Sequence, residues 1–117
     1  MNVILLHGKD ADPSMKWYPW FAAEMDRLGI DCRVPALPRA EDPILAEWTV
    51  EIDRLAPDGH TVLVGHSRGG VAILRWLEMQ PVGQRVKAVI LIATNSGHSE
   101  KMSKSENSKT FFSDAGY

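Results

Sequence analysis

Cysteine and long apolar runs are both scarce in this sequence, and each shortage excludes a class of protein. The 117 residues contain one cysteine, Cys32, so an internal disulfide is impossible and a reducing compartment is expected. The first apolar run, residues 3–6, follows no basic region and is far too short to span a membrane. We therefore expect a cytoplasmic protein without a membrane partner.

The chain also lacks a strong excess of charge of either sign. It has 13 Lys and Arg residues against 15 Asp and Glu residues, for a formal net charge of −2. This balance offers no electrostatic basis for binding nucleic acid, so no nucleic-acid partner is expected. The phosphate-binding patterns G-x-x-x-x-G-K-[ST] and G-x-G-x-x-G are absent as well.

What the chain does have, over residues 1–97, is a regular alternation of two patterns. Short apolar runs predict four strands, at residues 3–6, 30–34, 61–64 and 86–93, the last of them buried on both faces. Helical spacing of apolar residues predicts three helices between them, at residues 19–28, 42–55 and 71–79. In this reading Pro19 lies in a first turn, and Asp42-Pro43 caps and starts the second helix. The order predicts an α/β fold of three layers, an open parallel sheet with helices on both faces.

Residues 98–117 have a different composition. The segment HSEKMSKSENSKTFFSDAGY is rich in Ser, Lys, Glu and Asn, and only Phe111, Phe112 and Tyr117 offer large apolar surfaces. We interpret residues 1–97 as a partial domain core. Residues 98–117 are interpreted as a polar tail, either flexible or the start of a lid on the surface.

One serine has the setting of a catalytic nucleophile. The segment VLVGHSRGG places Gly65, Ser67 and Gly69 in a G-x-S-x-G pattern between an apolar strand and an amphipathic helix, as in a nucleophile elbow. The glycines allow close approach of neighbouring backbones, and the N–H of Arg68 would face a developing oxyanion at the helix N-terminus. The alternative is that Ser67 only caps the helix.

The end of the first strand offers a second oxyanion donor. The sequence Leu6-His7-Gly8-Lys9 follows that strand, and Gly8 permits an unusual turn in which the N–H of Lys9 or of Gly8 faces Ser67. The alternative is an ordinary turn that ends the strand. Both segments lie at the carboxyl ends of parallel strands, where sites form in open α/β sheets.

With these residues in place, the chain resembles the α/β-hydrolase superfamily, and more narrowly the small serine hydrolases of the retinoblastoma-binding-protein-9 and YdeN type. The matching stretches are LLHGKDADPSMKWYPWFAAEM, RVPALPRAEDPILAEWTVEI, TVLVGHSRGGVAILRWL and VKAVILIATNSG. The resemblance implies the strand order 2-1-3-4, a Ser67 nucleophile and oxyanion donors at the N–H groups of Arg68 and Lys9. It also implies hydrolysis of a small ester or amide without a metal or an organic cofactor.

Five further residues bear on the substrate pocket. We expect Arg68, where many relatives carry a small or apolar residue, to keep its backbone role while its side chain alters what the pocket accepts. The other pocket residues are expected to be His7, Gly8, Trp17 and His66. The natural substrate stays undefined, because the pocket depends on the segment after the fourth strand. Trp17, Trp20 and Trp48 either line an acyl pocket or, as tryptophans more often do, pack helices on the sheet.

The partners that would activate Ser67 are not evident. In this superfamily a triad acid and then a histidine follow the serine. The only later histidine is His98, and the later acids are Glu78, Glu100, Glu106 and Asp114. Glu78 would lie about 16 Å along the helix that Ser67 opens, and the others have no strand to place them. His66 is expected to point away from Ser67, and His60 to lie at the opposite end of the sheet.

Two functions remain open. The first is a serine hydrolase represented by its amino-terminal portion, cut before the last strands and inactive or nearly so. The second is a non-catalytic, hydrolase-like binding module that pairs through its exposed fourth strand with a partner chain or with a second copy.

Overall fold

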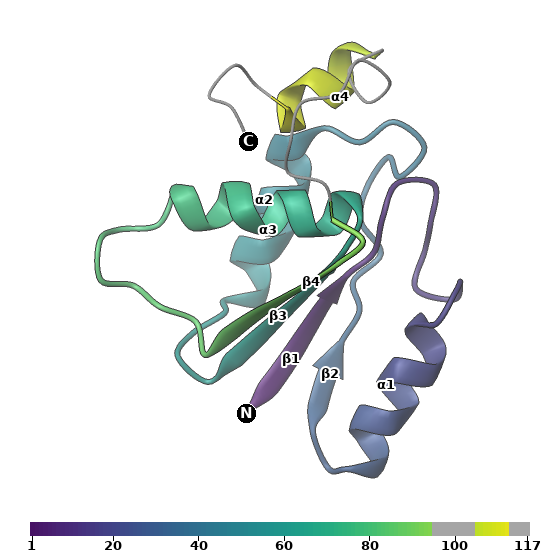
Figure 1. Ribbon diagram of the computed structural model, residues 1–117, viewed down its shortest axis with the longest axis vertical. Coiled ribbons are helices and arrows are strands. Elements are labelled where there is room, and N and C mark those ends of the chain that lie inside the picture. Colours follow the sequence, from purple (N-terminus) through teal and green to yellow (C-terminus); the bar gives the residue numbers. More distant parts are fainter. Residues whose placement is uncertain (95–104, 113–117) are drawn as a thin grey trace.

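A four-stranded parallel sheet forms the centre of the computed structural model, which describes residues 1–94 and 105–112 (Figure 1). The strand order is β2-β1-β3-β4, which confirms the order 2-1-3-4 that the resemblance implied. The bounds are β1 (Asn2–Leu6), β2 (Asp31–Arg33), β3 (Thr61–His66) and β4 (Ala88–Ile92). Leu6 lies beside Gly65, and His66 beside Ile92, so three strands end together at one edge of the sheet.

Helices cover both faces of this sheet, which confirms the three predicted layers. Helix α1 (Tyr18–Arg27) packs on one face, and α2 (Leu45–Leu55) with α3 (Arg68–Glu78) on the other. Successive side chains of a strand point to opposite faces. Strand β1 accordingly sends Val3 and Leu5 to the cluster beneath α1, and Ile4 and Leu6 to the cluster beneath α2 and α3.

The prediction that the fourth strand is buried on both faces was wrong for the described chain. Val89 packs against the cluster beneath α3, whereas Ile90 is 48% exposed and Leu91 and Ile92 are exposed too. The reason is the position of β4 at the edge of the sheet, where β3 is its neighbour. Its run of β-branched residues reports strand propensity, which does not say how many neighbours the strand has.

The predicted cap at Asp42-Pro43 was also wrong. Helix α2 begins at Leu45 with Ile44 as its N-cap residue. The Asp42 carboxylate instead accepts hydrogen bonds from Ser105 Oγ (2.8 Å) and Asn107 Nδ2 (3.1 Å). A tertiary contact of Asp42 has therefore replaced the local one that its sequence neighbours suggested.

One of these partners, Asn107, belongs to a short helix, α4 (Glu106–Phe111), inside the segment interpreted as a polar tail, and the other, Ser105, is the N-cap residue of that helix. Ser105 caps α4 by accepting from the N–H of Ser108. Phe111 and Phe112 are buried, and the Phe111 ring meets Trp48 of α2 edge-on at 5.5 Å. This part of the segment therefore adds to the core. The expectation for residues 98–104 and 113–117 lies outside the described residues.

In the described part of the chain, no helix has the length and apolar character that crossing a membrane requires.

Phe111→Ala should lower the free energy of unfolding by about 3 kcal/mol, because it leaves a cavity against Trp48 and removes a fully buried ring. Urea denaturation followed by tryptophan fluorescence measures the change. Lys109→Ala, an exposed substitution on the same helix, should change stability by no more than about 0.5 kcal/mol. Equal stability of the two variants would contradict the packing of α4 on the core.

Candidate active site

Ser67 sits on a strained turn between β3 and α3. Its backbone has φ 54° and ψ −120°, a conformation that residues with a side chain rarely adopt. The turn is held by the Ser67 N–H, which donates to Ile92 O (2.9 Å), and by the Gly70 N–H, which donates to Ser67 O (3.0 Å). Although Ser67 is the N-cap residue of α3, its side chain makes no capping hydrogen bond. The interpretation of Ser67 as a simple helix cap is therefore wrong.

Close backbone contacts explain the glycines around Ser67. A Cβ atom on Gly65 would collide with the backbone of Gly70, and one on Gly69 would collide with the carbonyl oxygen of Leu6. Helix α3 can therefore start directly above the ends of β1 and β3. The predicted close approach at both glycines is confirmed.

The turn after β1 lies against the serine turn. A Cβ atom on Gly8 would stand 3.2 Å from Ser67 Cβ, closer than side-chain contacts normally come, and 3.7 Å from Ser67 Oγ. The turn at Gly8 and the turn at Ser67, which are far apart in the sequence, thus meet at the carboxyl edge of the sheet. Only a residue without a side chain leaves open space beside the serine hydroxyl here.

His7 shapes the Gly8 turn from within the core. Its Nε2 accepts the N–H of Leu37 (2.9 Å), so its Nδ1 carries the proton that it donates to Gly8 O (2.9 Å). The ring is fully buried, and this burial lowers the pKa of His7, against smaller opposing effects of Gly8 and Asp12. A neutral ring with both nitrogens engaged leaves no lone pair for Ser67. His7 therefore supports the site without lining an open pocket.

Tyr18, at the start of α1, links the Gly8 turn to the serine turn. Its hydroxyl oxygen accepts the N–H of Gly8 (3.1 Å) and lies 2.6 Å from Nδ1 of His66. No motif in the sequence marks this residue as part of the site. A signal was available, because a tyrosine among buried aromatic residues needs a hydrogen-bond partner.

The two backbone amides expected to bind an oxyanion have no acceptor in residues 1–94 and 105–112. Within those ranges neither the Arg68 N–H nor the Lys9 N–H donates a hydrogen bond. The Gly8 N–H is occupied by Tyr18, which leaves Lys9 as the candidate on its turn. Arg68 opens α3, so its amide also has the positive end of the helix dipole.

The sequence model of the family described as Serine hydrolase matches residues 3–114. This chain belongs to the serine hydrolase family.

Two comparisons with YdeN of Bacillus subtilis agree with this family and with the α/β-hydrolase fold. YdeN of strain 168 is 29% identical over 94 residues, which are 79% of this chain and 50% of YdeN. The crystal structure of the ydeN gene product superposes with a TM-score of 0.78 at 25% identity, covering 86% of this chain and 55% of that one. The chain thus spans about half the length of the relative it matches.

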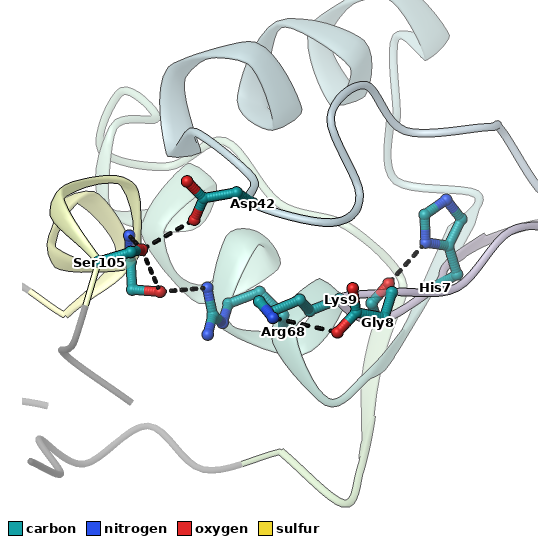
Figure 2. A network of polar contacts seen from close by, with 8 residues as sticks. His7, Gly8, Lys9, Asp42, Arg68 and Ser105 are labelled. Atoms are coloured by element: carbon teal, nitrogen blue, oxygen red, sulfur yellow. Dashed lines mark hydrogen bonds and ion pairs between the residues drawn. The ribbon is translucent and has the colours of Figure 1, made fainter. Parts of the chain in front are cut away.

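In this member of the serine hydrolase family the Arg68 side chain is directed at α4 (Figure 2). It is 6% exposed, its Cζ lies 5.0 Å from the ring centres of both Phe111 and Phe112, and its Nη1 donates to Ser108 Oγ (3.4 Å). Burial lowers the pKa of the guanidinium, while the carboxylates of Asp42 and Asp10 act in the opposite direction. Arg68, which opens α3 directly after Ser67, therefore also anchors α4 with its side chain.

Trp17 and His66 lie together beside the serine turn. Their ring centres are 5.4 Å apart in an edge-on contact, and both side chains are partly exposed. Burial lowers the pKa of His66, and the charge of Lys16 adds to this effect. The other two tryptophans differ, since Trp48 is fully buried beneath α2 and Trp20 is 64% exposed.

The described residues place no base at Ser67. No histidine of residues 1–94 hydrogen-bonds to its Oγ, and His60 is exposed at the amino end of β3, as predicted. Glu78 ends α3 and pairs with Arg75, and Glu106 pairs with Lys109. The candidates His98, Glu100 and Asp114 lie outside the described residues. Within the described ranges there is also no cluster of His, Cys, Asp and Glu that would hold a metal ion.

The lowered pKa values of His7 and His66 predict a loss of stability in mild acid. Such a histidine binds protons more readily in the unfolded chain, so its stabilising effect is complete above about pH 6.5 and is lost as the pH falls towards its folded pKa. The free energy of unfolding, measured by urea denaturation, should therefore be lower at pH 5.0 than at pH 7.5.

His7→Gln identifies the contribution of the buried ring. The variant should be less stable at pH 7.5 by about 1–3 kcal/mol, because the flexible amide lacks the ring geometry that bonds the Leu37 N–H and Gly8 O at the same time. The free energy of unfolding of the variant should also depend less on pH than that of the parent. A variant with the parent's full pH dependence would show that His7 is not its source.

Proposed function

We propose that this chain carries the nucleophile and oxyanion site of a hydrolase that cleaves a small ester or amide through an acyl-enzyme on Ser67. The observation that carries the proposal is the geometry of the serine turn. The Ser67 backbone is strained, its side chain makes no capping hydrogen bond, and the Gly8 turn lies close against it. The amides of Arg68 and Lys9, which have no acceptor among the residues that the structure describes, support it further. The family supports hydrolysis, and the choice of ester or amide is part of the proposal.

In the proposed reaction, Ser67 Oγ attacks the acyl carbon and its proton passes to a base. The carbonyl oxygen becomes an oxyanion that accepts hydrogen bonds from the amides of Arg68 and Lys9. The alcohol or amine leaves with a proton, and water then hydrolyses the acyl ester on Ser67. The described residues supply no base for the first step, so low turnover of the chain as it stands belongs to the proposal. An oxyanion site without its triad retains only about 10³- to 10⁴-fold catalysis over water.

A fluorophosphonate probe tests the role of Ser67. We expect slow labelling at one site, read by intact-protein mass and peptide mapping, because the reagent reports nucleophile and oxyanion site together. Ser67→Ala should abolish it, and Ser14→Ala, at an exposed loop serine, should leave it unchanged. Labelling that survives in Ser67→Ala, or no labelling of the parent, would show that Ser67 is not the proposed nucleophile. Labelling as fast as in a complete serine hydrolase would contradict low turnover.

The exposed strand β4 supports a second candidate, self-association. In the described residues β4 pairs with β3 on one side, and its apolar side chains are exposed. An edge of this kind is a template for strand addition, and a second copy of the chain supplies an identical edge. We propose that copies pair through β4 in the cytoplasm, the compartment for which the single free cysteine argues.

Light scattering at several concentrations tests this pairing. The molar mass should rise with concentration for the parent and for Val82→Lys, which alters an exposed apolar residue before β4. Ile90→Lys should remain a monomer, because a charge on an exposed edge strand opposes pairing. A monomeric parent at every concentration would exclude self-association through β4.

A further inference from the structure

We infer that Tyr18 is a positioning residue for the proposed active site: its hydroxyl joins the two turns that carry the oxyanion donors and decides which amides face Ser67. The inference rests on the proposed function of Ser67. The inference extends the proposed function, because it assigns a role to a residue of α1 for which the described part of the chain shows no hydrogen bond to Ser67.

The hydroxyl is held between two groups from distant parts of the chain. Its oxygen accepts from the Gly8 N–H at 3.1 Å and lies within hydrogen-bond distance, 2.6 Å, of Nδ1 of His66. Tyr18 is fully buried, so water does not replace either partner without opening the site. One oxygen atom thus ties the turn after β1 to the residue that precedes Ser67.

This arrangement selects the oxyanion donor on the Gly8 turn. With the Gly8 N–H turned to Tyr18, that amide is unavailable to a substrate, and the next amide, that of Lys9, remains without an acceptor in the described residues. Two successive amides of a tight turn point in different directions, so fixing the first restricts the second. The close approach of Gly8, on which a Cβ atom would stand only 3.2 Å from Ser67 Cβ, then limits where the Lys9 amide lies relative to the nucleophile.

The same hydroxyl sets the orientation of His66. The hydrogen bond between Tyr18 and His66 keeps Nδ1 of the ring turned towards α1. The His66 ring also meets Tyr18 and Trp17 edge-on, at 5.6 Å and 5.4 Å between ring centres. Because Ser67 follows His66 directly, an anchored His66 restrains the strained serine backbone.

Tyr18→Phe removes only the oxygen and keeps the ring contacts. The rate of Ser67-dependent fluorophosphonate labelling should fall by about 10- to 100-fold, the effect of displacing a reacting group by roughly 1 Å. The matched control is Thr61→Val, which removes another buried hydroxyl, one that bonds Asn2 and Asp58 at the opposite end of β3. Thr61→Val should reduce thermal stability while labelling stays within about 2-fold of the parent, since a distant, independent site is changed.

Nuclear magnetic resonance gives a readout that needs no reactivity. In Tyr18→Phe the amide signals of Gly8 and Lys9 and the ring nitrogens of His66 should shift, and the Gly8 amide should exchange its hydrogen faster. Thr61→Val should leave all of these signals in place.

The outcomes separate the inference from the proposed function. Labelling of Tyr18→Phe at the parent's rate, or an equal loss in both variants, would overturn the positioning role. If the parent itself is not labelled, the proposed function fails and the amide and ring signals decide about Tyr18. An unchanged Lys9 amide signal in Tyr18→Phe would then overturn the inference.

Discussion

The parallel pairing of β1 with β3 is the constraint on which the site depends. Its register sets Leu6 beside Gly65, so both strands end at the same level and the turns that follow are forced together. The start of α3 then passes over the carbonyl of Leu6, where only Gly69 fits, and Gly8 meets Ser67. The strained backbone of Ser67 persists because the packing around this junction leaves it no alternative.

Buried polar side chains complete what the pairing begins. His7 connects the end of β1 to the backbone of Leu37, and Tyr18 connects the same turn to His66. Each bond spans a long stretch of sequence and satisfies a group that would otherwise be buried without a partner, which costs about 1–3 kcal/mol. The loops at this edge are therefore tied to one another by side-chain hydrogen bonds in addition to the pairing of the strands that they extend.

Arg68 joins the proposed chemistry to the last segment of the chain that the structure describes. Its backbone opens α3 beside Ser67, and the side chain is directed at the segment around α4 (Figure 2). There its Cζ lies 5.0 Å from the ring centres of both Phe111 and Phe112. Asp42 and Thr110 add hydrogen bonds between α4 and the start of α2. Besides the Gly8 turn and the serine turn, the core thus has α4 near the carboxyl edge of its sheet. It has this helix although the chain spans only about half the length of YdeN.

Local patterns in the sequence were enough to predict the strands, the three longer helices and the glycine contacts of the serine turn, because these features arise from periodicity and from short-range sterics. The strand order came from the resemblance to known hydrolases. The short helix α4, the exposure of β4, the partners of Asp42 and the bridge through Tyr18 were decided by tertiary structure alone. Asp42 before Pro43 has the local pattern of a cap, and Tyr18 that of an ordinary core aromatic. Which distant group reaches each of them depends on the folded arrangement of elements, and no local pattern encodes it.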